Sequence, residues 1–233
     1  MSVHRRVCHP CLLSCLLLLA LPVAAAPPRT LTLATWNLEW LMTPQTHAAL
    51  RASCTQEGES RVAVRSLPCD VAREPARGAA DFARLRDYAV RLDADVIAIQ
   101  EVDGPQAAAQ VFPDHDFCFT ARRAVQNNGF AIRRGRGIRF HCEPDFGALA
   151  VGHGQLRAGA QLTLFPGTPR ELHLLGVHLK SGCASQPLDE PQEACELLSR
   201  QAAPLRQWVE AQARAGHRFV LLGDFNRRLA RER

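Results

Sequence analysis

Apolar residues recur along the chain in two patterns, short continuous runs and helical spacings. Continuous runs bounded by polar or turn residues are typical of buried strands. Such runs occupy residues 31–36, 95–99, 161–165, 172–177 and 219–223. Shorter strands are predicted near residues 117–120, 129–132, 138–142 and 148–151.

Two longer stretches repeat apolar residues on one helical face. The spacing from Phe82 to Leu92 predicts an amphipathic helix over roughly residues 77–92. A second helix is predicted over residues 192–213, where Pro204 either kinks one helix or begins a second. Strands that alternate with helices in this way indicate an α/β domain.

Length and composition agree with one folded domain. The chain has 233 residues, of which 47% are hydrophobic and 22% are charged, and this balance excludes a disordered or collagen-like protein. The formal net charge of +5 is mildly basic. No stretch forms a polybasic arm, so charge alone identifies no partner.

The first 25 residues have the pattern of a secretory signal peptide. Basic Arg5 and Arg6 precede an apolar run over residues 12–21, and small residues follow up to Ala25. The run is shorter than the about 20 apolar residues that span a membrane. The sequence therefore predicts a signal peptide at residues 1–25 and one domain at 26–233, exported to the periplasm or fully secreted, without a membrane anchor.

Six cysteines remain after the signal peptide, an even number that favours disulfides in an exported chain. Six cysteines allow 15 connectivities. Pairing of sequence neighbours is our hypothesis, and it joins Cys54 to Cys69, Cys118 to Cys142, and Cys183 to Cys195. Zinc is the competing interpretation, but no Cys-x-x-Cys pair remains in the predicted mature part to complete a site with the histidines.

Polar clusters follow four of the predicted buried strands. They are Asn37-Leu38-Glu39, Gln100-Glu101, His178-Leu179-Lys180-Ser181 and Asp224-Phe225-Asn226. Taken singly, each cluster has a structural explanation as a turn, a strand cap or a core histidine. Taken together they indicate a site, because ligands of α/β sheets collect where side chains leave the strand ends.

The side chains in these clusters suit the hydrolysis of a phosphate ester. They comprise carboxylates, amides, an imidazole and an ammonium group, namely Glu101, Asp224, Asn37, Asn226, His178 and Lys180, the last being the single lysine of the chain. Oxygen ligands from one or two carboxylates suit Mg²⁺. His178 and Lys180 can neutralise charge on phosphoryl oxygens, and Asp224 can orient or deprotonate a water. The chain has no Gly-x-Ser-x-Gly motif, which argues against acyl transfer.

In these clusters the chain resembles the endonuclease/exonuclease/phosphatase superfamily, which includes DNase I-like nucleases, inositol-phosphate 5-phosphatases and neutral sphingomyelinases. Four motifs of that family occur in order: Thr35-Trp36-Asn37-Leu38-Glu39-Trp40, Ile99-Gln100-Glu101-Val102, Val177-His178-Leu179-Lys180-Ser181 and Leu222-Gly223-Asp224-Phe225-Asn226. The resemblance extends from Leu31 to Arg227. It implies a four-layer α-β-β-α sandwich of two packed mixed sheets, with the site at one rim.

The resemblance also implies a metal site and a role for each residue in it. Glu101 would be the main ligand of Mg²⁺ or Mn²⁺, with Asn37 and Glu39 beside it. His178 would bind the scissile phosphate and assist the leaving group.

Three further residues of the last two motifs carry implied roles. Asp224 would orient the attacking water or protonate the leaving oxygen. Asn226 would hold the phosphate or Asp224. Lys180 would contact substrate phosphate, unless it is a surface lysine near the site.

The final motif of the family, an Asp-His pair on a C-terminal strand, is absent from this sequence. Seven residues follow Asn226, and none of them is histidine. Two interpretations remain: a longer enzyme whose last strands are missing here, which we favour, or a chain that cannot complete the reaction. Missing strands would leave an exposed sheet edge and predict poor solubility.

The leading hypothesis is an exported metal-dependent phosphodiesterase, most simply a nuclease acting on DNA or RNA. Arginines between residues 133 and 139 are candidates for contact with a phosphate backbone. One alternative is a phosphomonoesterase or lipid phosphodiesterase on the same scaffold. Another is a catalytically dead binding protein. No obligate protein partner is evident from the sequence.

Overall fold

The computed structural model describes residues 30–54, 59–62, 65–122, 124–152 and 156–231. The predicted signal peptide lies outside these residues. Within them, no helix combines the length and apolar character needed to cross a membrane.

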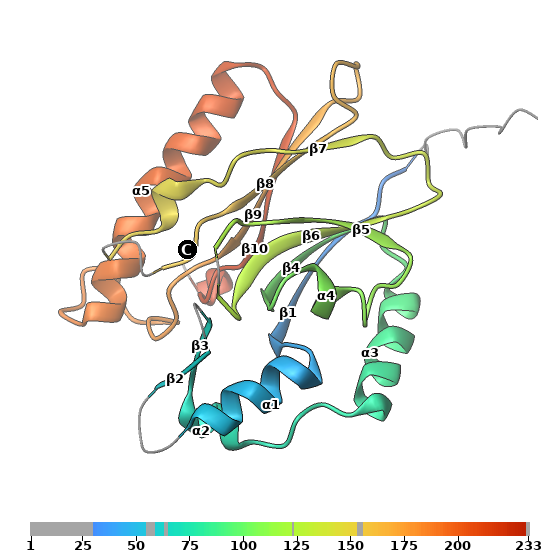
Figure 1. The fold of residues 1–233 in the computed structure, drawn as a ribbon. Helices are drawn as coiled ribbons and strands as arrows, with labels where there is room; N and C mark the ends of the chain where they lie inside the picture. Colours follow the sequence, from blue (N-terminus) through green and yellow to red (C-terminus); the bar gives the residue numbers. More distant parts are fainter. Residues whose placement is uncertain (1–29, 55–58, 63–64, 123, 153–155, 232–233) are drawn as a thin grey trace, which may run out of the picture.

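Two four-stranded mixed sheets form the centre of the fold (Figure 1). The first sheet has the order β1 (Leu33–Leu41), β4 (Val96–Val102), β6 (Asn127–Arg133) and β5 (His115–Phe119). The second has the order β10 (Phe219–Asp224), β9 (Leu172–His178), β8 (Ala160–Leu164) and β7 (Phe140–Cys142). In each sheet the first pair is parallel and the others are antiparallel. A small hairpin, β2 (Glu59–Val62) and β3 (Arg65–Pro68), stands apart from both.

Helices cover the outer faces of the two sheets and complete four layers. The principal ones are α3 (Ala79–Leu92) on the first sheet and α5 (Glu193–Arg214) on the second. Shorter helices are α1 (Pro44–Ser53), α2 (Cys69–Arg73) and α4 (Pro105–Ala108), with 3₁₀ turns η1 (Gly147–Leu149) and η2 (Leu229–Arg231). The predicted α-β-β-α sandwich is confirmed.

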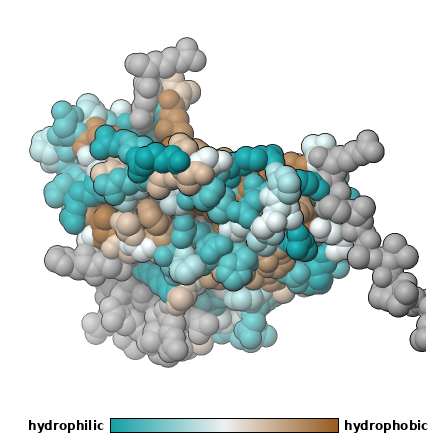
Figure 2. Space-filling model, turned by 90° about the horizontal axis from the view of Figure 1, so that it is seen from above, coloured by the Kyte–Doolittle hydropathy of each residue, from teal (hydrophilic) through white to brown (hydrophobic). Residues whose placement is uncertain are grey.

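Successive side chains of a strand point to opposite faces of its sheet, so a separate apolar core forms at each boundary between layers. On β4, Ile97 and Ile99 face α3, whereas Val96 and Ala98 pack between the sheets against β6, β8 and β9. A third core lies between the second sheet and α5, where Trp208 is buried. Seen from above, the outer surface mixes small hydrophilic and hydrophobic areas (Figure 2).

The helix predictions agree closely with the structure. The predicted helix at 77–92 corresponds to α3, and the one at 192–213 corresponds to α5. Pro204 lies inside α5, so the structure contains one helix rather than two. Helix α1 was not predicted, and it begins where the Thr43 hydroxyl accepts a hydrogen bond from the Thr46 backbone N–H.

The strand predicted at 148–151 is wrong, because this segment contains the 3₁₀ turn η1. Leu149 is fully buried in the core beneath α5. Its carbonyl oxygen accepts a hydrogen bond from the side chain of Gln201 on α5 instead of a strand neighbour. A short apolar run is ambiguous in such a case, since burial alone does not require an extended backbone.

All six cysteines of the predicted mature chain form disulfides between sequence neighbours. The bonds join Cys54 to Cys69, Cys118 to Cys142, and Cys183 to Cys195, with Cα–Cα distances of 5.6, 5.5 and 5.0 Å. The first connects the end of α1 to the start of α2. The second joins β5 to β7 and therefore links the two sheets, and the third ties the segment after β9 to α5.

Strands β1 and β10 lie side by side at the edges of their sheets. Within the described residues each pairs with a strand on one side only, and every residue of β10 is half-buried. β10 approaches β9 closely at Gly223, whose φ is 138°. A Cβ atom there would lie 2.1 Å from the carbonyl oxygen of Val177.

We expect Gly223→Ala to destabilise the fold by about 2 kcal/mol or more, because the added methyl group meets rigid backbone in a strained conformation. Gly147→Ala is the matched control, since a Cβ atom at Gly147 meets nothing within 4 Å. Urea unfolding of both variants checks the prediction. Equal unfolding free energies would show that β10 can move away from β9 without loss.

Candidate functional site

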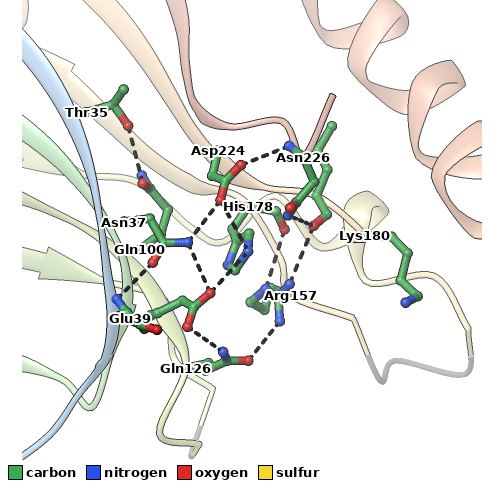
Figure 3. Close-up of polar contacts among 12 residues, drawn as sticks. Thr35, Asn37, Glu39, Gln100, Gln126, Arg157, His178, Lys180, Asp224 and Asn226 are labelled. Carbon is green, nitrogen blue, oxygen red and sulfur yellow. Dashed lines mark hydrogen bonds and ion pairs between the residues drawn. The ribbon is translucent and has the colours of Figure 1, made fainter. Parts of the chain in front are cut away.

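Two parallel strand pairs, one in each sheet, end at the same rim. In the first sheet Asn37 of β1 lies opposite Gln100 of β4. In the second sheet Asp224 of β10 lies opposite His178 of β9. Because β1 and β10 are side by side, the four strand ends converge (Figure 3). The polar clusters predicted from sequence therefore meet in space.

The side chain of Asn37 joins the two sheets. Its Nδ2 donates to Glu101 Oε1 at 3.0 Å and to Asp224 Oδ2 at 2.9 Å. Its Oδ1 accepts the backbone N–H of Glu39 at 2.9 Å, which fixes the direction of the amide. One amide nitrogen thus holds two carboxylates that come from strands of different sheets.

Glu101 is held by donors on both carboxylate oxygens. Besides the bond from Asn37, its Oε2 accepts from Gln126 Nε2 at 2.7 Å and from the backbone N–H of Trp40 at 3.3 Å. The side chain is only 14% exposed. These contacts satisfy the buried charge of Glu101 and fix the direction of its carboxylate.

The backbone at this rim departs from regular strand geometry. Alternation after Ile97 and Ile99 would direct Glu101 toward α3, away from the site. A register shift on both sides of β4 and a φ of 61° at Glu101 turn the side chain into the site instead. Positive φ values also occur at Glu39, Trp40 and Asn226. Each such residue costs about 1–3 kcal/mol, so the rest of the fold must hold the rim in place.

His178 is buried between the two carboxylates, with 4% of its side chain exposed. Its Nε2 lies 3.6 Å from Glu101 Oε1 and 3.7 Å from Asp224 Oδ2. Burial, followed by the charge of Arg157, lowers the pKa of His178 to about 4, although both carboxylates oppose this shift. His178 is therefore a neutral imidazole at neutral pH. Its Nδ1 is buried and has no hydrogen-bond partner among the described residues.

Asp224 and Asn226 form a rigid turn at the end of β10. The backbone N–H of Asn226 donates to Asp224 Oδ1 at 2.8 Å, while Asp224 Oδ2 accepts from Asn37. The Asn226 side chain donates to the carbonyl oxygen of Leu179, next to His178. Asn226 therefore holds Asp224 through its backbone and the His178 segment through its amide.

Glu39 and Lys180 have their charged groups apart from this cluster. The Glu39 carboxylate makes no hydrogen bond or ion pair with the residues that the structure describes, and it lines an adjacent cavity of about 150 Å³ together with Trp40. The Lys180 Nζ donates to the carbonyl oxygen of Ser181 at 3.0 Å and points away from Asp224 (Figure 3). Their predicted roles, as metal ligand and phosphate contact, remain predictions.

Two site residues, Gln126 and Arg157, were not found by sequence reasoning. Gln126 Nε2 donates to Glu101, and its Oε1 accepts from Arg157 Nη1 at 3.0 Å. Burial lowers the pKa of Arg157 to about 10, so the guanidinium remains charged at neutral pH. Neither residue belongs to a recognisable motif. Because the chain is rich in arginine, the sequence does not distinguish Arg157 from the other arginines.

The arginines between residues 133 and 139 lie away from the site. β6 begins beside the site at Asn127 and runs antiparallel to β4, so Arg133 is at the opposite end of the sheet. Three of these arginines pair with aspartates, as Arg133 with Asp93, Arg134 with Asp116 and Arg136 with Asp95. These three arginines are thus engaged in ion pairs away from the carboxylates of the site.

The donor set fits a hard divalent cation by its chemistry. Glu101 and Asp224 bring carboxylate oxygens to one point, while the amide of Asn37 presents its Nδ2 there. Mg²⁺ is commonly bound by one or two carboxylates together with waters. In the described part of the chain, no group of three or more His, Cys, Asp or Glu side chains forms a ready-made metal cage.

Comparisons with known proteins agree with the motifs. The sequence model of the endonuclease/exonuclease/phosphatase family matches residues 34–231. No curated protein sequence matches the chain.

Several solved structures resemble the fold. Humanized TDP2 of D. rerio has 15% sequence identity and a TM-score of 0.51, and the match covers 84% of this chain and 62% of that one. The mannosyl-6-phosphatase of Bacteroides thetaiotaomicron has 12% identity and a TM-score of 0.48, over 84% and 66% of the two chains. D. rerio TDP2 complexed with a single-strand DNA product has 20% identity and a TM-score of 0.48, over 65% and 56%. The chain thus spans about three fifths of the length of the first of these proteins.

We expect acid to destabilise the protein through His178. Because its folded pKa of about 4 lies below its ordinary value of 6.5, the unfolded state binds more protons between these two values. The stability from a neutral His178 is fully present above about pH 6.5 and declines as the pH falls toward about 4. His178→Gln should therefore have a shallower pH dependence of unfolding free energy over this range. The unfolding free energy is measured by urea unfolding at several pH values. An equal change of this free energy with pH in the variant and in wild type would contradict the prediction.

Proposed function

The chain belongs to the endonuclease/exonuclease/phosphatase family, and on this premise we propose that it is an exported, Mg²⁺-dependent phosphodiesterase that hydrolyses DNA or RNA. The observation that carries the proposal is the amide of Asn37, which holds Glu101 and Asp224 together beside a neutral, buried His178. Hydrolysis of a phosphodiester needs an activated water, neutralisation of the charge on the phosphoryl oxygens and a fixed orientation of the reacting groups. The residues of this rim are suited to these three tasks.

In this proposal Glu101 is the main ligand of the divalent cation. Asn37 would bind it through its Oδ1, which here accepts the backbone N–H of Glu39. When bound, the cation supplies Lewis-acid stabilisation of the phosphoryl oxygens. Mn²⁺ offers the same oxygen-ligand chemistry. Glu39, on the same strand end, is the further candidate ligand.

In the same proposal Asp224 orients and deprotonates the attacking water. Its carboxylate accepts hydrogen bonds from Asn226 and Asn37, which fix its direction before a substrate binds. His178 presents a neutral imidazole, which can donate an N–H to a phosphoryl oxygen without carrying a charge into the buried site. The new bond forms between the water oxygen and phosphorus, and the bond to the leaving oxygen breaks. Asp224 accepts the proton of the attacking water, and the leaving alkoxide takes a proton from bulk water to become the alcohol.

Export is supported by the three disulfides, since such bonds persist in oxidising compartments. The predicted signal peptide at residues 1–25 is consistent with this location. We place the enzymatic domain at residues 26–233. Nucleic acid is the proposed substrate because the chain is mildly basic and the family includes nucleases.

A plasmid-nicking assay tests the substrate class. We expect nicking of supercoiled DNA or cleavage of RNA with Mg²⁺ or Mn²⁺, and none with EDTA. Phospholipids, inositol phosphates and sugar phosphates are assayed in parallel. Turnover of one of these without any cleavage of nucleic acid would replace the nuclease proposal by a phosphomonoesterase or lipid phosphodiesterase.

Substitutions at the carboxylates test the site itself. Glu101→Gln and Asp224→Asn should each lower kcat by about 10²- to 10³-fold, the effect expected when one preorganised group at a transition state is lost. Glu196→Gln is the control, since this residue is exposed on α5. An activity that survives both site substitutions would place catalysis elsewhere. No activity in wild type toward any phosphoester would favour a binding protein.

A further inference from the structure

An irregular connecting segment, residues 181–192, leads from the end of β9 to the start of α5 (Figure 1). The structure describes all of these residues, and they form no helix or strand. Cys183 is the buried residue among them, while the others are exposed or half-buried. A segment with so few buried side chains has little packing energy to fix its conformation.

One covalent bond and one hydrogen bond attach the beginning of this segment to α5. The disulfide joins Cys183 to Cys195 in the first turn of the helix, and both cysteines are fully buried. About 9 Å further along the helix axis, the fully buried Gln201 accepts the backbone N–H of Lys180. The amide of Gln201 also donates to the carbonyl oxygen of Leu149 at 2.9 Å, so its direction is fixed.

The connecting segment also contacts the chain directly after the turn at the end of β10. Arg227 Nη1 donates to the carbonyl oxygens of Cys183 and Gln186, at 2.8 and 2.7 Å. The backbone N–H of Arg228 donates to the carbonyl oxygen of Ala184 at 2.9 Å. A change in the position of the segment would therefore be felt at the turn that carries the proposed catalytic carboxylate.

His178 is linked to the same set of contacts. The backbone N–H of Leu179 donates to the Asp224 carbonyl oxygen at 2.9 Å, and the Leu179 carbonyl oxygen accepts from the Asn226 side chain at 2.9 Å. The ends of β9 and β10 are thus held to each other at Leu179. Beyond this point, the connecting segment and α5 support both ends from outside the sheet.

We propose that the phosphodiesterase is active only after the disulfide between Cys183 and Cys195 has formed, because this bond fixes the segment that supports the site. The inference rests on the proposed function. Without the bond, the segment is held by hydrogen bonds and by the half-buried Leu188. The strand ends then lose the support that orients His178 and Asp224. A misplacement of reacting groups by about 1 Å can lower a rate by about 10²-fold.

The bond forms by thiol–disulfide exchange. The thiols of Cys183 and Cys195 together lose two protons and two electrons, and a bond forms between their sulfur atoms. A disulfide-bearing oxidant takes up both electrons and both protons and becomes two thiols. Because both cysteines are fully buried in the folded protein, a thiolate cannot readily attack the bond afterwards. The bond is therefore made once, during folding, and is not a reversible switch.

This dependence would match the activity to the compartment of the protein. Thiols are kept reduced in the cytosol, whereas disulfides form and persist after export. A chain that has not been exported would have a loosely held site in the compartment that contains the nucleic acid of its own cell. Export and oxidation would then complete the site.

Removal of one disulfide at a time tests the proposal on the whole chain. Cys183→Ala/Cys195→Ala should lower kcat for a phosphodiester by about 10- to 100-fold and leave KM nearly unchanged, because the site loses orientation rather than substrate contacts. Cys54→Ala/Cys69→Ala is the matched control, since this bond has a similar sequence separation, 15 against 12, and joins α1 to α2. The control should keep its kcat. Equal losses in both variants, or no loss in the first, would overturn the proposal.

Amide hydrogen exchange tests the support of the strand ends without requiring turnover. In Cys183→Ala/Cys195→Ala the amide protons of Leu179, Lys180 and Arg228 should exchange about 10-fold faster or more, while the amides of β4 keep their wild-type rates. Unchanged rates at these three amides, or equally faster exchange in every strand, would contradict the proposal. If exchange changes as expected but oxidised wild type hydrolyses no phosphoester, the proposed function fails and the role of the disulfide in holding the segment stands.

A folding control accompanies these measurements. Near-ultraviolet circular dichroism establishes that each variant is folded. If the variant without the Cys183–Cys195 bond does not fold, Gln201→Met and Arg227→Met decide the matter, because each keeps the disulfide and removes a contact of the segment or of the residue before it. Each should lower kcat by about 5-fold, the effect of one hydrogen bond, with KM nearly unchanged. An unchanged kcat in both folded variants would contradict the proposal.

Discussion

The site depends on one side chain that joins two sheets. Asn37 donates from a single nitrogen to Glu101 of the first sheet and to Asp224 of the second. Two buried or half-buried carboxylates at such a short separation repel each other unless a donor or a cation lies between them. The contacts of Asn37 therefore have two effects. They join the two sheets, and they hold the two carboxylates of the site together.

The surrounding fold holds a strained rim in place. Four of the described non-glycine residues with positive φ, namely Glu39, Trp40, Glu101 and Asn226, occur at the site. Their cost must be offset by the rest of the structure. The three apolar cores between the layers provide this support, and the disulfide from Cys183 to Cys195 anchors the segment after β9 to α5. Arg227 adds a hydrogen bond to the carbonyl oxygen of Cys183.

The pattern of apolar residues predicted helices and strands best where it had one clear form, either helical spacing or a continuous run. The apolar face from Phe82 to Leu92 became α3, and the run before Gln100 became a strand buried on both faces. The pattern was misleading at Leu149, where Gln201 from a distant helix binds the carbonyl oxygen. It also did not indicate α1, whose start depends on a cap at Thr43 rather than on apolar spacing.

The sequence by itself determined the α/β character of the domain and the polar clusters at four strand ends, because each depends on residues close together in the chain. It left the pairing of neighbouring cysteines as one hypothesis among 15 connectivities, which the structure bears out. Only the tertiary structure decided which of these polar groups meet. Gln126 and Arg157 enter the site because two sheets stack, and the arginines after Arg133 lie away from it because β6 runs antiparallel to β4. Lys180 shares a motif with His178, yet its ammonium group points away from the carboxylates. The direction of a side chain follows from local backbone geometry and from neighbours distant in sequence, and no motif contains that information.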